Sequence, residues 1–308
     1  MGGSRLSAAW FGALHERLRG RAQWGPDDRR GTLNHITAAR LVAAADEVQM
    51  GKSVTLAAPL AGSAPDNPEP GMRHMKHLPG EPSDVPGLSF AADQLVMNVH
   101  GNADSHIDAL CHVSYGQALY NGVLPGAVTS QGASELSIDD ARDGIAGRGV
   151  LLDIPRLRGL PWLEPGDHVT AEELASAEAA QRVQLRPGDL LFVRVGHRQR
   201  RRELGPWDAA RSRAGLHPQA MEYLAEREVA VLGSDGNSDT APSLVEDVAF
   251  PVHVLAINAM GMHLLDYLQF DDLVPLCEAA GRWSFLCVIA PLRLPGGTGS
   301  PINPVAIM

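Results

Sequence analysis

The 308-residue sequence predicts a mixed α/β fold of the α+β class with a strand-rich core. Short apolar runs typical of strands outnumber the helical patterns, and the helical patterns mostly occur singly. Neither an internal repeat nor a convincing boundary divides the chain. We therefore expect a single domain over residues 1–308.

The expected strands are short runs rich in valine, leucine and isoleucine, bounded by glycine, proline or aspartate. Seven runs have this character: SVTLAAPL (53–60), QLVMNVH (94–100), GVLLDI (149–154), DLLFVRV (189–195), VAVLGS (229–234), HVLAINA (253–259) and WSFLCVIA (283–290). Helices do not alternate regularly with them, so a simple βαβ repeat is not predicted.

The expected helices carry recognisable start and stop signals. Four segments qualify: TAARLVAAADEVQMG (37–51), TAEELASAEAAQR (170–182), HPQAMEYLAERE (217–228) and DDLVPLCEAAGR (271–282). Thr37 is a capping residue, Thr170 and Glu173 form a capping box, and Gly281 is a typical helix stop.

Two further segments lack a strong pattern. Residues 61–91 are rich in proline and glycine, and we expect a long loop inside the domain or a subunit-contacting arm. The basic stretch RQRRRE (198–203) is expected to be a solvated loop or the start of a helix.

Composition and charge restrict the class of partner. The formal net charge of -10 argues against binding to nucleic acid or to an anionic membrane. Three scattered cysteines suggest a reducing compartment, and the N-terminal residues do not resemble a signal peptide. No apolar run of about 18 residues is present, so we expect a cytoplasmic protein without a membrane partner that acts on a small molecule.

The chemistry concentrates in HGNADSHIDALCH, residues 100–112, which holds three histidines, two aspartates and one cysteine. If this stretch is extended, His106 and Asp108 project to the same side. If the chain turns helical at Ala109, His112 returns over them one turn later. Imidazole and carboxylate groups are a common ligand pair for zinc or manganese, so a metal site or a catalytic site is favoured over a buried polar turn.

Cys111 leaves a second chemistry open. It neighbours His112, and a cysteine–histidine pair could form a nucleophile site. Adjacent side chains on a strand or a helix point apart, however, and a cysteine in the apolar context DALC (108–111) is typical of a protein core.

The segment SHIDALCH (105–112) resembles the HxGTHxDxxxH signature of the cyclase family of metal-dependent hydrolases, which includes bacterial kynurenine formamidase, isatin hydrolase and a trans-dienelactone hydrolase. The resemblance extends over nearly the whole chain, from WGPDDRRGTLNHIT (24–37) to PLRLPGGTGSPINPVAI (291–307). It implies a domain of the swivelling β/β/α type, a divalent metal that is zinc or manganese, and a homodimer or larger homo-oligomer.

By position, the resemblance assigns His106 and Asp108 as metal ligands and His112 as the acid/base. The downstream ligands correspond to His253 and Asp266, although glutamate is usual at the latter position. We therefore expect a side-chain atom of His253 within about 5 Å of the Asp108 carboxylate, since two ligands of one metal each lie roughly 2 Å from it.

The first histidine of the signature falls in strict register on Asn102. An amide oxygen can bind a metal, but more weakly than imidazole. His100, two residues earlier, could replace it if the backbone bulges. The choice between Asn102 and His100 stays open, and with it the number of metals.

Weaker candidates lie around this set. Asp104 could orient a ligand imidazole or serve in a turn. Trp24 and His35 could reach the substrate. Asp235 and Asp239 follow a predicted strand and could line the pocket, although turn chemistry is the favoured interpretation.

Taken together, the residues and the resemblance predict a metal-dependent hydrolase. It would cleave an amide, cyclic amide or lactone bond of a small molecule with metal-activated water. Two alternatives remain: a non-catalytic metal-binding protein on the same scaffold, and a metal-independent hydrolase that depends on Cys111. The sequence does not identify the substrate.

Overall fold

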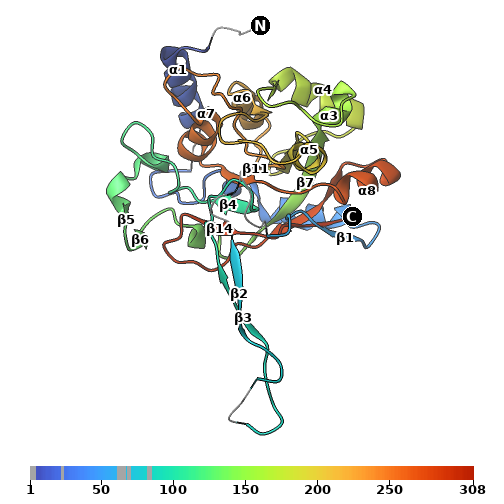
Figure 1. The fold of residues 1–308 in the computed structure, drawn as a ribbon. Coiled ribbons are helices and arrows are strands. Elements are labelled where there is room, and N and C mark those ends of the chain that lie inside the picture. Colours follow the sequence, from blue (N-terminus) through green and yellow to red (C-terminus); the bar gives the residue numbers. More distant parts are fainter. Residues whose placement is uncertain (1–4, 22–23, 61–66, 68–70, 82–84) are drawn as a thin grey trace.

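A computed structural model describes residues 5–21, 24–60, 67, 71–81 and 85–308. Its centre is a nine-stranded sheet with helices packed against it (Figure 1). The predicted mixed α/β class is therefore confirmed. None of the helices in the described part of the chain is long and apolar enough to cross a bilayer.

The strand order in the sheet is β1-β15-β13-β7-β9-β11-β12-β4-β14. Its four middle strands are mutually parallel: β7 (Ile145–Asp153), β9 (Leu190–Arg194), β11 (Val231–Ser234) and β12 (His263–Asp266). The flanking strands pair antiparallel: β1 (Ser53–Thr55), β15 (Val305–Ile307), β13 (Ser284–Ile289), β4 (His106–Asp108) and β14 (Gly299–Pro301). The apolar middle strands are buried, as expected for strands covered on both faces.

Most helices lie on one side of the sheet in Figure 1. The α-helices are α1 (Ala8–Arg19), α2 (Ala38–Ala44), α3 (Ile154–Arg158), α4 (Ala171–Gln181), α5 (His197–Leu204), α6 (Ala220–Glu226), α7 (Pro251–His253) and α8 (Leu273–Ala280). The predicted signals are present: Thr37 accepts a hydrogen bond from the Arg40 amide, the Thr170–Glu173 capping box forms, and Gly281 ends α8 with φ 59°.

Short elements connect these helices and strands. The 3-10 helices are η1 (Gly31–His35), η2 (Ala45–Glu47), η3 (Tyr120–Gly122), η4 (Pro125–Ala127) and η5 (Ile138–Ala141). Two small sheets pair β5 (Val128–Thr129) with β6 (Gly132–Ala133), and β8 (His168–Val169) with β10 (Gly215–Leu216). The basic stretch 198–203 lies within helix α5, in line with a helix start.

The prediction of a strand over residues 253–259 is wrong. Helix α7 ends at His253 and continues directly into a π-helix, η6 (Val254–Met260), which Gly261 terminates with φ 68°. Every residue of η6 is buried. A short run that is apolar on all sides carries no periodicity, so its sequence does not distinguish a buried strand from a buried helix.

Residues 61–91, expected to form a long loop or a subunit-contacting arm, include a strand that the sequence did not predict. Strand β2 (Met72–His77) pairs antiparallel with β3 (Ala92–Val96), and this hairpin extends away from the body of the molecule as an arm (Figure 1). Residues 61–66, 68–70 and 82–84 lie outside the described residues. The strand predicted over 94–100 ends at Val96, and the following turn leads to His100.

Candidate metal and catalytic site

Two neighbouring strands present acidic and imidazole side chains on one face of the sheet. His106 and Asp108 stand at alternate positions of β4, and Asp266 of β12 is paired directly with His106. All three side chains are buried. The alternation expected from the sequence and the antiparallel register thus bring one imidazole and two carboxylates together.

A hydrogen bond from Nδ1 sets the orientation of the His106 ring. Its Nδ1 donates to the backbone carbonyl of Asp104 at 2.8 Å, so the Nε2 lone pair faces inward, 3.6 Å from Asp108 Oδ1. Asp104 therefore positions the imidazole through its carbonyl group. Such a hydrogen bond is the usual device that orients a metal-binding histidine.

His253 reaches the same cluster from the helical segment. Its Nε2 lies 3.5 Å from Asp108 Oδ2 and 3.5 Å from Asp266 Oδ2. The predicted approach of His253 to the Asp108 carboxylate is confirmed. Its Nδ1 donates to Asp239 Oδ2 at 2.6 Å, and the Asp239 carboxylate also accepts the backbone amides of Val252 and His253.

Between the two candidates for the first histidine, the structure brings His100 to the cluster. Its Nδ1 lies 2.9 Å from Asp108 Oδ1, and its Nε2 lies 2.9 Å from the hydroxyl of Thr298. Asn102 lines the surrounding pocket, but its side chain is exposed and forms no hydrogen bond with the cluster in the described part of the chain. His100 lies in the turn that follows β3, and this turn, in place of the bulge considered above, brings its imidazole to the cluster.

His112 returns to the cluster through a tight turn, in which its amide donates to the carbonyl of Ala109 at 3.0 Å. Its ring stacks on that of His100 with centroids 3.8 Å apart. Ligand-capable atoms of His100, Asp108 and His112 lie within 4.8 Å of one another. Burial, aided by the neighbouring histidines, lowers the pKa of His112 to about 4, so its imidazole is neutral at pH 7.

Asp266 is fully buried and rigidly held. Its Oδ1 accepts from the Ser238 amide at 3.1 Å and the Ser238 hydroxyl at 2.8 Å, and its Oδ2 accepts from Asn237 at 2.5 Å. Burial raises the pKa of Asp266. Although its side chain is one methylene shorter than that of glutamate, Asp266 lies 3.5 Å from His253 Nε2.

The loop after β11 supplies two residues that the sequence analysis did not single out, Asn237 and Ser238, together with the two weaker candidates Asp235 and Asp239. Asn237 and Ser238 hold Asp266, and Asp239 holds His253, whereas Asp235 accepts the amides of Val195 and Gly196. The usable signal was their place at the carboxyl end of a buried parallel strand, where sites commonly form.

The cluster has the electrostatics of a cation site. Asp108 Oδ2 is buried and has no hydrogen-bond partner among the described residues, although it faces His253. Burial alone would lower the pKa of His253, but the carboxylates of Asp239, Asp266 and Asp108 raise it to about 9. Buried carboxylates require positive charge nearby, and inward-facing imidazole nitrogens with carboxylate oxygens suit a divalent metal.

A pocket of about 510 Å³ opens onto this cluster. Besides the histidines and Asp108, its wall includes apolar side chains, among them Val248, Phe250 and Val254. The combination of an apolar wall and convergent polar groups is typical of a site for a small molecule.

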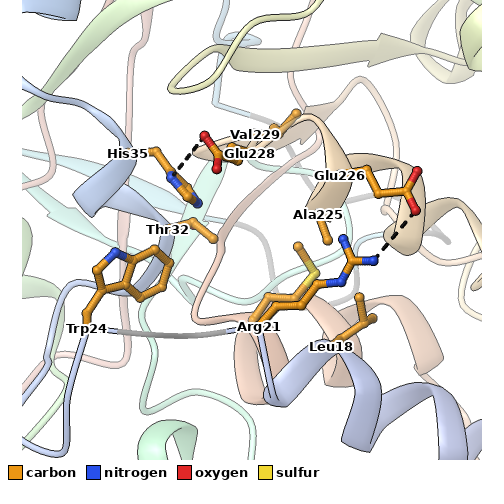
Figure 2. A pocket seen from close by; sticks show the side chains of 10 residues that line it. Leu18, Arg21, Trp24, Thr32, His35, Ala225, Glu226, Glu228 and Val229 are labelled. Carbon is orange, nitrogen blue, oxygen red and sulfur yellow. Dashed lines mark ion pairs between the residues drawn. The ribbon is translucent and has the colours of Figure 1, made fainter.

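Trp24 and His35 do not lie in that pocket. They line a different cavity of about 390 Å³, shown in Figure 2, and the described linings of the two cavities share no residue. The expectation that Trp24 and His35 contact the substrate at the cluster therefore finds no support in the geometry.

Cys111 is buried, and its thiol faces the carbonyl of Gly297 at 3.9 Å. Burial raises the pKa of the thiol to about 11. A thiolate is the reactive form of cysteine, so this environment disfavours a nucleophile.

Comparisons with known proteins give a matching family model and a similar solved structure. The family model described as "Putative cyclase" matches residues 32–239, a range that ends before His253 and Asp266. A crystal structure of a novel cyclase is 32% identical, covers 96% of this chain and 99% of its own, and has a TM-score of 0.85. A comparison with curated proteins gives no match.

More distant structures share the fold. An isatin hydrolase bound to the product analogue thioisatinate is 21% identical, with 88% of this chain and 95% of that chain covered and a TM-score of 0.58. A "predicted metal-dependent hydrolase" from Bacillus stearothermophilus is 17% identical, with coverages of 83% and 97% and a TM-score of 0.52.

Proposed function

The chain belongs to the cyclase family, and from this premise we propose that it is a metal-dependent hydrolase that cleaves an amide, cyclic amide or lactone bond of a small molecule. One observation carries the proposal. The buried Asp108 Oδ2 has no hydrogen-bond partner among the described residues, while His253 Nε2 faces it at 3.5 Å.

The proposed metal ligands are His106, Asp108 and His253, completed by His100 and Asp266. The two inward-facing Nε2 atoms and the buried carboxylates support this set. Nitrogen and oxygen donors of this kind suit both zinc and manganese. Asn102, exposed in the pocket, is the less favoured candidate.

When bound, a divalent ion would make hydroxide available near neutral pH and polarise the carbonyl under attack. His112 is the proposed acid/base, because its neutral ring can accept the proton of water and return it to the leaving nitrogen or oxygen. Stacking on His100 holds the His112 ring toward the pocket. Asp239 accepts the Nδ1 proton of His253, so Nε2 is the nitrogen that faces the carboxylates and would bind the metal as its proton is displaced.

The two alternatives are less well supported. A purely structural metal site is closed by its protein ligands, whereas this cluster borders a pocket of about 510 Å³. A Cys111-dependent mechanism would require an accessible thiolate, and the thiol is buried with a raised pKa.

A homodimer or larger homo-oligomer in the cytoplasm completes the proposal. The arm formed by β2 and β3 exposes apolar side chains, namely Met72, Met75, Leu95 and Val96, which supports self-association. Three free cysteines, all buried, are consistent with a reducing compartment.

The test combines metal analysis of the purified protein with a hydrolysis screen of N-formylkynurenine, isatin and small lactones. We expect activity on one of these classes that disappears on chelation and returns when zinc or manganese is added. Cys111→Ser should remain active. Activity that survives complete chelation but is lost in Cys111→Ser would contradict the proposal.

A further inference from the structure

Arg213 is a buried cation to which the proposed reaction gives no part. The residue is only 2% exposed, and in the described part of the chain it forms no ion pair with a carboxylate. Arginine is seldom fully buried unless it is paired, because the removal of a charge from water is costly. A cation kept in this position therefore points to a role that offsets the cost.

Uncharged oxygen atoms hold the guanidinium in place. Its Nη1 donates to the carbonyls of Ala209 and Ala210, each at 3.0 Å. Its Nε donates to the carbonyl of Asp239 at 2.9 Å and to Oδ1 of Asn237 at 3.2 Å. Arg213 thus fastens the loop after β11 to the segment that precedes Arg213 itself.

The bond from Arg213 helps to set the orientation of the Asn237 amide. Oδ1 of Asn237 accepts from Arg213 Nε and from the backbone amide of Asp239 at 3.0 Å, while its Nδ2 donates to Asp266 Oδ2 at 2.5 Å. An amide rotated by half a turn would place N–H groups against these two donors and an oxygen against the carboxylate. Arg213 therefore favours the orientation in which Asn237 holds Asp266.

The carboxylate held in this way belongs to the proposed metal site. The same Oδ2 atom of Asp266 lies 3.5 Å from His253 Nε2. A single side-chain amide, that of Asn237, thus connects the guanidinium of Arg213 to a proposed metal ligand. Groups that orient a ligand from outside the ligand set commonly affect metal affinity.

Arg213 acts on the site through its neighbours. The ring of Phe250, which lines the pocket at the cluster, has its centroid 5.2 Å from the guanidinium carbon of Arg213. Arg213 itself is not among the described residues that line this pocket. A guanidinium also has only donors and no free lone pair, so it cannot bind the metal.

We propose that Arg213 is a positioning residue of the metal site, which fixes the amide of Asn237 and through it the carboxylate of Asp266. The inference rests on the proposed metal-dependent function and extends it to a residue outside the ligand set. The clamp combines Nε and Nη1 of one planar group, an arrangement that lysine does not reproduce.

The test measures metal binding by the full-length, metal-free protein. Zinc is titrated in competition with a chromophoric chelator, and the visible absorption of the cobalt(II)-loaded protein reports the geometry of the ligands. Arg213→Gln should weaken zinc binding about tenfold and shift the cobalt bands, because the group orienting Asp266 is lost. Arg213→Lys keeps the charge and should fold, yet it should change both readouts in the same direction. Unchanged zinc affinity and cobalt bands in these variants would overturn the inference.

A double-mutant cycle shows whether Arg213 acts through Asn237. In an Asn237→Ala background, Arg213→Gln should change zinc affinity by less than about twofold, since the connecting amide is already absent. The same loss of affinity in both backgrounds would mean that the two residues act independently, and would overturn the inference.

Thr240→Val is the matched control for the loop. Thr240 is buried in the same loop, and its hydroxyl donates to the carbonyl of Leu216 at 3.3 Å. Its variant should keep the zinc affinity of the natural protein, and a loss equal to that in Arg213→Gln would indicate a general disturbance of the loop and overturn the inference. A natural protein that binds neither zinc nor cobalt would refute the proposed function and this inference with it. Metal binding by the natural protein that Arg213 variants leave intact would refute the inference alone.

Discussion

The Nε2 atom of His253 lies 3.5 Å from Asp108 Oδ2, although the two residues belong to distant parts of the chain. One stands on strand β4 and the other at the end of helix α7. Their meeting beside a carboxylate oxygen without a hydrogen-bond partner among the described residues is the central feature of the candidate site.

Removal of a central ligand should empty the site. We expect His106→Ala and Asp108→Ala each to lose bound metal and hydrolase activity together, because each deletes an inward-facing donor. Metal content measured by mass spectrometry and initial rates check this. His168→Ala and the exposed Asp208→Asn are matched controls that should retain both properties. Full occupancy in both ligand variants would show that the metal binds elsewhere.

His100 and Asn102 can be told apart by the same measurement. His100→Ala should reduce metal affinity, since its imidazole contacts Asp108 at 2.9 Å, whereas Asn102→Ala should leave it nearly unchanged because that side chain is exposed. Competitive titration with a chromophoric chelator gives both dissociation constants. The reverse ranking would restore the strict register of the signature.

Asp239 should act through His253. Asp239→Asn removes the carboxylate that holds Nδ1–H, and metal affinity should fall about 10–100-fold, as is typical when the group orienting a ligand is lost. Asp235→Asn is the matched control, because Asp235 is similarly buried in the same loop but, among the described residues, accepts the amides of Val195 and Gly196 and no histidine. A similar loss of affinity in both variants would indicate a general disturbance of the loop.

His112 should affect turnover more than metal content. We expect His112→Ala to retain most of the metal and to lower kcat about 10²–10⁴-fold, the usual contribution of a general acid–base group. Single-turnover kinetics on metal-quantified protein measure this. If the variant instead loses its metal, His112 is a ligand and another group transfers the proton.

Acid should destabilise the fold through partly buried histidines away from the cluster. Burial lowers the pKa of both His35 and His217 in the folded protein. Near and below about pH 6.5 the unfolded chain therefore binds more protons at these two residues than the folded chain does. Stability should therefore fall between pH 7.5 and 5.5. In urea unfolding, His35→Gln/His217→Gln should reduce that fall, and the exposed His74→Gln should not. An equal fall in all three proteins would contradict this assignment.

Local patterns were enough to predict several elements. Thr37, the Thr170–Glu173 box and Gly281 mark the ends of helices in the structure as they do in the sequence, because capping involves groups only a few residues apart. The placement of His106 and Asp108 on one side follows equally from the two-residue period of a strand.

Tertiary structure decided the rest. The apolar run after His253 is a π-helix that is buried on all sides. A run that is apolar throughout shows no periodicity, so its conformation depends on the packing around it. The approach of His253 to Asp108 was inferred from a family resemblance, and only the fold shows the contact. Asp239 contacts His253 and His100 contacts Asp108, whereas Trp24 and His35 line a separate cavity. Strand register and the paths of the loops decide these positions, because local periodicity does not relate segments that are distant in the sequence.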